Sequence, residues 1–373
     1  MENKKLGFGC MRLPLLDAKD QNSIDYKEFE KMIDAFLERG FTYFDTAYMY
    51  HNYQSETAVR EALVKRHPRE SFTVADKMPT MFLKSQEDLE RIFKEQLDKV
   101  GVDYFDYYLL HNLGVNNYRI AEEFNAFDFI QEKKAEGKAK LIGFSYHDSA
   151  ALLDEILTAH PEVDFVQLQI NYIDWDNESI QSRKCYEVAQ KHGKPVIVME
   201  PIKGGVLANL PEKAEELFQA SQPDMSVPSW AIRFAASHEG VMMVLSGMSD
   251  HEQLLDNTGY MQNFEPLSEK EFEVVEKAVQ IINEEIVVPC TACQYCVEGC
   301  PMQIAIPNYF ALLNAKNRGK AASFSTEDAY YNNLTKTHGK ASDCIECGKC
   351  EKSCPQHIHI MEGLKIVAEV FES

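Results

Sequence analysis

The stretch FTYFDTAYMYH, Phe41 to His51, decides the fold. A short apolar strand ends within it at Asp45, and Tyr50 follows in the loop beyond that strand. The segment before it, residues 25–39, has apolar residues at the i, i+3, i+4 spacing of an amphipathic helix, and Gly40 stands where such a helix stops. Helix, short strand and polar loop together predict one unit of an α/β protein.

The same unit repeats along the chain and predicts eight strands. They are expected at Leu6–Cys10, Phe41–Asp45, Phe72–Lys77, Phe105–His111, Lys140–Ser145, Phe165–Gln169, Pro195–Met199 and Val241–Ser246. Eight strand and helix units over about 280 residues favour a (β/α)₈ barrel of the TIM type, with its active site at the carboxyl ends of the strands. An open, doubly wound sheet is the alternative, but no GxGxxG follows any early strand.

Composition sets the limits on domains and partners. A length of 373 residues suits a barrel of about 250 residues plus an appendage, and we place the boundary so that residues 1–283 form the barrel and 284–373 the second domain. No uncharged run is long enough to span a membrane, which predicts a cytoplasmic protein. The net charge of −21 argues against binding to nucleic acid or an anionic membrane.

Cysteines gather at the C-terminal end of the chain, where eight of the ten lie between Cys290 and Cys354. They form two runs with the same spacing, Cys290-x₂-Cys293-x₂-Cys296-x₃-Cys300-Pro301 and Cys344-x₂-Cys347-x₂-Cys350-x₃-Cys354-Pro355. This spacing resembles that of the bacterial two-cluster ferredoxins, in which the fourth cysteine of each run binds the other cluster. Zinc bound by four thiolates is the alternative.

On that resemblance the second domain is ferredoxin-like and holds two [4Fe–4S] clusters. The implied ligands of one cluster are Cys290, Cys293, Cys296 and Cys354, and those of the other are Cys300, Cys344, Cys347 and Cys350.

Polar residues at the ends of three predicted strands carry a second resemblance. Asp45 and Tyr50 are joined by Lys77, at the end of the third strand, and by His111, at the end of the fourth. In this order the chain resembles the aldo-keto reductases over about residues 5 to 265, and with its cysteine tail it resembles the iron–sulfur branch of that family. The resemblance implies an oxidoreductase that reduces a carbonyl, or oxidises an alcohol, with Tyr50 as proton donor.

Elementary electrostatics gives these four residues consistent roles. A tyrosine titrates near 10 in water, so a neighbouring cation is expected to stabilise its phenolate. Lys77 would supply that charge and Asp45 would hold the lysine in place. His111 would hydrogen-bond the carbonyl oxygen that Tyr50 protonates.

The resemblance also implies a nicotinamide cofactor, NADP or NAD. Ser145 and Gln167 match the residues that hold the carboxamide of the nicotinamide. The residues expected on the pyrophosphate and adenine side are Met11, Arg12, Gly247, Gln253 and Asn257.

Three features depart from the family pattern. Tyr146 stands where the family commonly has asparagine, Glu200 lies near the usual position of an aromatic residue that stacks on the nicotinamide, and residues 246–250 contain no Arg or Lys for the 2′-phosphate of NADP. The choice between NAD and NADP therefore stays open. So do two other functions: a reductase driven by the clusters without nicotinamide, and an electron-transfer or redox-sensing protein with a structural barrel.

Basic residues near the cysteine runs suggest a partner, an acidic electron carrier such as ferredoxin. They are Lys316, Arg318, Lys320, Lys336, Lys340, Lys349 and Lys352. Acidic residues are interspersed among them, so an ordinary solvated surface is the favoured alternative.

Overall fold

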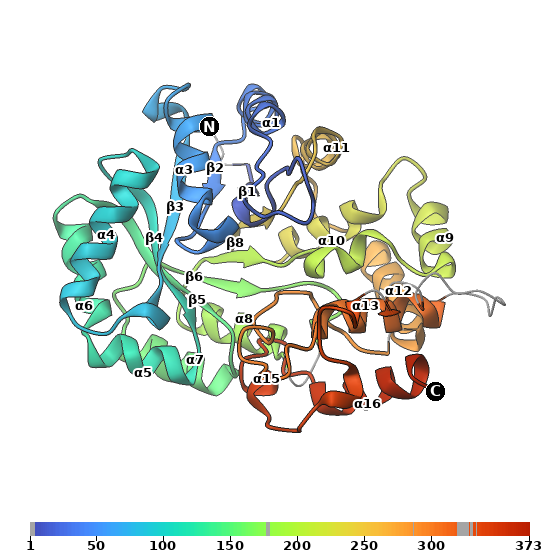
Figure 1. Cartoon of the computed structure of the whole chain (residues 1–373). Helices are drawn as coiled ribbons and strands as arrows, with labels where there is room; N and C mark the ends of the chain where they lie inside the picture. The colour runs from blue at the N-terminus through green and yellow to red at the C-terminus, as the bar shows by residue number, and fades with distance from the viewer. Residues whose placement is uncertain (1–3, 177–179, 286, 319–327, 329–330, 333) are drawn as a thin grey trace. The chain divides into compact units, whose positions relative to one another are not determined.

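The computed structural model describes residues 4–176, 180–285, 287–318, 328, 331–332 and 334–373 (Figure 1). Lys320 of the predicted docking surface lies outside the described residues, as do residues 177–179 of the loop after the sixth strand. Contacts divide the chain into two compact units. The first comprises residues 1–177, 181–201 and 228–268, and the second comprises 178–180, 202–227 and 269–373.

Eight parallel strands of the first unit close into a barrel in sequence order (Figure 1). The strands are β1 (Leu6–Gly9), β2 (Tyr43–Asp45), β3 (Thr73–Met78), β4 (Phe105–Leu113), β5 (Ala139–Tyr146), β6 (Phe165–Gln169), β7 (Val196–Met199) and β8 (Val241–Ser246). Strand β8 pairs with β1, which completes the closure. The predicted barrel is confirmed, and the alternative of an open sheet is wrong.

Helices of the first unit lie between these strands along the chain and outside them in space (Figure 1). They are α1 (Tyr26–Glu38), α2 (Tyr50–Tyr53), α3 (Ser55–Val59), α4 (Glu87–Val100), α5 (Val115–Glu123), α6 (Ala126–Ala135), α7 (Ala150–Ala159), α8 (Ser182–Lys191), α10 (Val227–Ala236) and α11 (His251–Met261). Asp25 caps α1 by accepting hydrogen bonds from the amides of Lys27 and Glu28. Gly101 ends α4 in the left-handed conformation, as its position predicts.

Side chains that point into the barrel form its inner core. They include Tyr43, Ala75, Tyr107, Leu109, Phe165, Ile197, Met243 and Leu245. Because side chains alternate along a strand, residues two positions further toward the carboxyl ends also face inward, at the mouth of the barrel. This alternation determines which polar residues can meet there.

In the part of the chain that the structure describes, the second unit contains helices of five numbered elements and the cysteine runs. The helices are α9 (Glu212–Ser221), α12 (Glu269–Glu285), α13 (Ile306–Arg318), α15 (Lys349–Lys352) and α16 (Ile360–Phe371). Since α9 packs along α12, the compact unit begins earlier than the predicted domain boundary at residue 284 and includes 202–227. The boundary between sequence domains stays a prediction.

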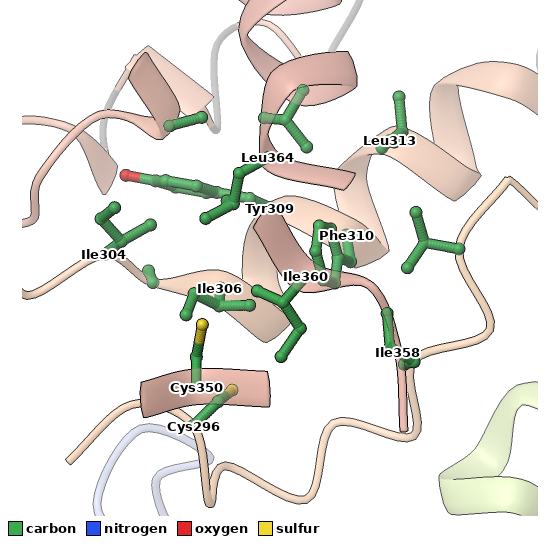
Figure 2. Close-up of a cluster of buried hydrophobic side chains, with 14 of the residues drawn as sticks. Cys296, Ile304, Ile306, Tyr309, Phe310, Leu313, Cys350, Ile358, Ile360 and Leu364 are labelled. Carbon is green, nitrogen blue, oxygen red and sulfur yellow. The ribbon is translucent and has the colours of Figure 1, made fainter. Parts of the chain in front are cut away.

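A separate hydrophobic core holds the second unit together (Figure 2). Tyr309, Phe310 and Leu364 lie at its centre, and Cys296 and Cys350 lie at its edge (Figure 2). The side chain of Asn314 bonds both the amide and the carbonyl of Val288, at 2.9 and 2.6 Å, and thereby anchors the segment that leads into the first cysteine run.

Close strand packing makes Gly143 in β5 a test of the barrel. A Cβ atom at this position would overlap the carbonyl oxygen of Phe165 in β6. We expect Gly143→Ala to destabilise the barrel by about 1–3 kcal/mol, measured by denaturant unfolding. Gly259→Ala in α11 is the control, because its Cβ would meet no atom within 4 Å, and it should be neutral or stabilising by about 0.5–1 kcal/mol. Equal effects of the two substitutions would contradict the close packing of β5 on β6.

Candidate active site and cysteine-lined cavities

Asp45, Lys77 and His111 meet at the mouth of the barrel because of strand alternation. Each lies two residues beyond a member of the inner core, and those members are Tyr43, Ala75 and Leu109. All three polar side chains are buried. Residues from β2, β3 and β4, separated by more than thirty positions from one strand to the next, therefore converge on one place.

A buried ion pair joins two of them. The Lys77 Nζ lies 2.5 Å from Asp45 Oδ1 and 2.7 Å from the carbonyl oxygen of Thr46. Lys77 is 0% exposed and Asp45 is 3% exposed. Burial raises the pKa of Asp45, while the charge and hydrogen bond of Lys77 pull it back down. Removing one partner of such a pair leaves an uncompensated charge and typically costs about 3–5 kcal/mol.

Tyr50 is held against this pair by an uncommon backbone. The three residues after it, His51, Asn52 and Tyr53, all have positive φ, at 50°, 50° and 69°. His51 stabilises the turn by accepting a 3.0 Å hydrogen bond at Nε2 from the amide of Leu13. Non-glycine residues in the left-handed region cost free energy and persist only where the surroundings impose them, often at functional sites.

The Tyr50 ring lies near both the lysine and the histidine. Lys77 Nζ is 5.0 Å from the ring centroid, and the ring of His111 stands edge-on to it with centroids 6.0 Å apart. The structure thus brings together all four residues that the sequence selects for proton transfer.

Tyr50 stays protonated at neutral pH in this setting. Its pKa lies well above the ordinary value because of burial first and then the negative charge of Asp45, and the neighbouring Cys10, Asp76 and Glu200 groups raise it further. Burial and the charge of Asp45 thus outweigh the acidifying effect that we expected from Lys77. The tyrosine is a phenol that holds its proton.

His111 is neutral in the same site. Burial lowers its pKa well below the ordinary value, and the charges of Lys77 and His147 lower it further. Among the described residues its Nδ1 has no hydrogen-bond partner, while its backbone carbonyl accepts a 2.8 Å bond from the Thr80 hydroxyl. A neutral imidazole has one N–H to donate and one nitrogen to accept.

A polar network behind β3 fixes the backbone of Lys77, and the sequence analysis missed it. Gln96 Nε2 donates to the Lys77 carbonyl at 2.9 Å, and Gln96 Oε1 accepts from the Tyr108 hydroxyl at 2.6 Å. Asp76 Oδ1 accepts from the Lys77 amide at 2.8 Å. Asp76 and Glu56 are both fully buried. The signal in the sequence was Asp76 itself, an acid on the outward face of a strand where apolar residues pack against helices.

Burial raises the pKa of Asp76 well above its ordinary value, and the neighbouring Glu56 carboxylate raises it further. Burial likewise raises the pKa of Glu56, against the charge of Lys99, which lies 3.4 Å from Glu56 Oε2. Two acids in such a place hold a proton more tightly than either would in water.

The two residues predicted at the carboxamide of a nicotinamide also face inward. Ser145 Oγ accepts a 2.7 Å bond from the amide of Asn112, which has a positive φ of 59°. Gln167 Nε2 lies 3.6 Å from Met199 Sδ, whereas its buried Oε1 has no partner among the described residues. A carboxamide N–H is a suitable donor for that oxygen, so the residues present fit the group.

Arg12, Gly247 and Gln253 lie around the loop after β8. A Cβ on Gly247 would stand 3.2 Å from the Arg12 side chain, and Ser249 Oγ donates to the Arg12 carbonyl at 3.1 Å. The Gln253 side chain accepts a 2.9 Å bond from the Ser249 amide. These four residues are exposed, and so is Met11. Arg12 therefore supplies a cation to a loop that has none of its own.

Asn257 differs from the other predicted cofactor residues. It is buried, its amide nitrogen donates to Ser246 Oγ at 3.0 Å, and its amide oxygen accepts from the Tyr260 hydroxyl at 2.6 Å. Its amide is thus engaged beneath the loop rather than presented on its exposed side.

Two of the departures from the family pattern have different consequences. Tyr146 follows Ser145 and so points out of the barrel, where its hydroxyl donates to the Ser149 carbonyl at 2.6 Å. Glu200 is half-buried just after β7, has a positive φ of 55°, and adds to the negative field on Tyr50. Of these two residues, only Glu200 affects the active site.

Cysteines of the second unit line two cavities. One is lined by Cys290, Cys293, Cys296 and Cys354, and the other by Cys300, Cys344, Cys347 and Cys350. The fourth cysteine of each run thus lies with the first three of the other run. Ile306 lines both cavities. Four thiols around an apolar space are the donor set and the surroundings that an iron–sulfur cluster requires.

Family comparisons agree with both halves of this arrangement. The model of the aldo/keto reductase family matches residues 5–280, and that of the 4Fe-4S dicluster domain matches residues 289–359. The chain belongs to the aldo/keto reductase family. It is an oxidoreductase with a C-terminal iron–sulfur domain, as the sequence predicts.

Individual relatives are distant. Probable aldo-keto reductase 1 of Glycine max is 28% identical over 241 residues, which are 60% of this chain and 66% of that protein. The uncharacterized oxidoreductase YqkF of Bacillus subtilis is 22% identical over 306 residues, 74% of this chain and 92% of that one. An aldo-keto reductase from Klebsiella pneumoniae, solved in complex with NADPH, aligns with a TM-score of 0.58 at 18% identity, over 74% of this chain and 95% of that one. In the part of our chain that the structure describes, we find no helix with the length and apolar character of a membrane span.

Asp76 predicts a pH dependence of stability. Its pKa is higher in the folded chain than in the unfolded one, so its contribution is full below about pH 4 and is lost as the pH rises. We expect Asp76→Asn, which keeps the acceptor for the Lys77 amide, to gain stability relative to the native protein as the pH rises above about 4.

Tryptophan fluorescence during urea unfolding measures this effect, because both tryptophans, Trp175 and Trp230, belong to the first unit. Asp128→Asn, at an exposed position of α6, is the control and should not change the pH profile. An Asp76→Asn protein with the same pH slope as the native one would show that Asp76 is not a buried acid that holds its proton.

Proposed function

We propose that the barrel reduces a carbonyl, or oxidises an alcohol, with a nicotinamide cofactor, and that Tyr50 carries the proton. The observation behind the proposal is the position of the protonated Tyr50 ring near both the Lys77–Asp45 pair and neutral His111. The substrate is a small carbonyl compound or the corresponding alcohol.

The residues divide the work as follows. Tyr50 donates its proton to the carbonyl oxygen while that oxygen gains negative charge, and His111 donates a second hydrogen bond to the same atom. Lys77 stabilises the phenolate that remains, and Asp45 keeps Lys77 in place and charged. Because Tyr50 binds its proton tightly beforehand, the transfer takes place only against a strongly basic oxygen, which is what carbonyl reduction creates.

Nicotinamide, when bound, supplies the hydride that reaches the carbonyl carbon. Ser145 and Gln167 would hold its carboxamide, and Gln167 Oε1 offers an unused acceptor for it. Met11, Arg12, Gly247 and Gln253 would hold the phosphate and adenine side, with Asn257 supporting the loop from below. The Arg12 guanidinium favours NADP over NAD, since it is suited to bind a 2′-phosphate.

Each set of four cysteines would bind one [4Fe–4S] cluster. The two clusters would take the place of one reaction partner: together they would accept, one electron each, the two electrons that oxidation of the nicotinamide or the alcohol releases, or supply the two that the reverse reduction consumes. An acidic carrier such as ferredoxin is the proposed external partner. Lys349 and Lys352 are exposed near the cavity of Cys300, Cys344, Cys347 and Cys350. Glu346 is exposed there too, and a solvated surface without a partner is the alternative.

One observation favours a second function, a reductase driven by the clusters without nicotinamide. Glu200 places a carboxylate near the position where the family stacks an aromatic residue on the nicotinamide, and a carboxylate has no ring to stack. The remaining hypothesis, electron transfer or redox sensing with a structural barrel, gives no role to a buried Lys77–Asp45 pair beside a strained tyrosine loop.

Replacing Tyr50 by Phe tests the proposed chemistry. The variant loses only the hydroxyl that donates the proton, so we expect carbonyl reduction with NADPH to fall by at least about 100-fold. Iron content and cluster absorbance should be unchanged, because Tyr50 does not belong to the second unit.

Tyr53→Phe is the matched control, since this tyrosine is exposed and lies three residues further along the same loop. It should retain most of the activity. A Tyr50→Phe protein with native turnover would contradict the role of Tyr50 as proton donor.

A further inference from the structure

A lysine is buried beside one of the two cysteine-lined cavities. Lys203 begins the short 3-10 helix Lys203–Ala208 and is 1% exposed. Its Nζ lies 3.4 Å from the side-chain oxygen of Gln356, which is itself buried and lines the cavity of Cys290, Cys293, Cys296 and Cys354. Lys203 and Gln356 belong to the same compact unit.

The backbone supports this placement of the lysine. Lys203 has a φ of 47°, and the next two residues, Gly204 and Gly205, have φ values of 67° and 101°. A lysine in the left-handed region costs free energy, which the surrounding structure has to offset. Burial of a lysine side chain adds to that cost. Both costs fall on one residue next to the cavity.

Lys203 reaches the cysteine set through Gln356. Gln356, whose side-chain oxygen lies 3.4 Å from Lys203 Nζ, follows Cys354 by two residues, and both line the same cavity. A buried positive charge at that place would favour additional negative charge on a centre bound to the Cys354 sulfur.

The cavity of Cys300, Cys344, Cys347 and Cys350 has different surroundings. Glu351 follows Cys350 directly in the chain and brings a negative charge close to this cavity. Glu351 is held in place by a 3.0 Å bond from the amide of Met361, a residue that lines this cavity. Cys347 is exposed, and its neighbour Ile345 is 61% exposed. Lys349 and Lys352 are exposed, so water and salt screen their charges.

We propose that the buried ammonium of Lys203 raises the reduction potential of the cluster at Cys290, Cys293, Cys296 and Cys354 above that of the cluster at Cys300, Cys344, Cys347 and Cys350. Reduction adds one electron, and hence one negative charge, to a cluster. A cation in a region of low dielectric stabilises that charge far more than one in water does. The inference rests on the proposed presence of two clusters.

This difference determines where electrons collect. Whether an external carrier or the barrel reaction supplies them, electrons shared between the two clusters would reside mainly on the cluster beside Lys203, which holds them more tightly. Ile306 lines both cavities, so two clusters bound there would be close neighbours.

Redox titration of the anaerobically purified full chain, followed by electron paramagnetic resonance, tests the proposal. The native protein should hold about eight iron atoms per chain and show two separate one-electron steps. In Lys203→Gln the step at higher potential should move to lower potential. At fixed ambient potential the ratio of oxidised to reduced cluster should rise at least about tenfold, which corresponds to about 59 mV for a one-electron couple.

Three further variants sharpen the result. Gln356→Glu should lower the potential of the same step, because the new carboxylate would pair with Lys203. This variant takes the place of Lys203→Gln in the test if Lys203→Gln fails to hold its iron. Lys203→Arg keeps the charge and should restore the native potential. Lys352→Gln removes an exposed lysine two residues from Cys354 and should change neither step.

The outcomes separate the inference from the proposal beneath it. A native protein with full iron but a single unresolved step would overturn the inference, and so would unchanged potentials in iron-replete Lys203→Gln or Gln356→Glu. A native protein that binds no iron and sulfide under anaerobic conditions would instead refute the proposed clusters.

Discussion

Two opposite charges buried side by side, Lys77 and Asp45, are the constraint on which the active site depends. Neither charge has access to water, so each needs the other within hydrogen-bond distance. Strands β2 and β3 must therefore keep their register at the barrel mouth. Gln96 and Asp76 hold the Lys77 backbone from the other side of the strand. The ammonium is consequently fixed beneath the Tyr50 ring.

The same pair explains why the tyrosine is not acidic by itself. Asp45 compensates the charge of Lys77 and adds its own negative field to that of Glu200. A site that lowered the pKa of Tyr50 permanently would deprotonate it and lose the proton donor. A phenol that holds its proton, with a cation nearby to stabilise the phenolate once it forms, serves carbonyl reduction better.

The second unit solves a different physical problem with few residues. Eight thiols must be held around two apolar cavities, and the hydrophobic core around Tyr309, Phe310 and Leu364 does this with little secondary structure (Figure 2). Polar groups are placed unevenly, since Lys203 and Gln356 lie by one cavity and Glu351 by the other. Two sets of identical ligands thereby acquire different electrostatic surroundings.

Local patterns predicted the features that depend on local periodicity. The barrel, and the convergence of Asp45, Lys77 and His111, follow from strands that end in polar residues. The outward direction of Tyr146 was also predictable, because it follows inward-facing Ser145 in a strand.

Other features depend on contacts between distant segments. The left-handed turn after Tyr50 includes Tyr53, a bulky residue that disfavours this conformation, and three consecutive residues of positive φ are imposed by the surrounding structure. The buried acids Glu56 and Asp76, and the position of Lys203 beside Gln356, arise from packing between segments that no periodicity relates.

Anaerobic titration of the purified protein with NADPH tests most directly whether the barrel reaction and the clusters form one electron path. Nicotinamide oxidation and cluster absorbance are followed in the same sample, without and then with a carbonyl substrate. The account predicts that NADPH is oxidised and the cluster absorbance bleaches. Carbonyl-dependent oxidation of NADPH with unchanged clusters, or no oxidation of NADPH at all, would contradict it.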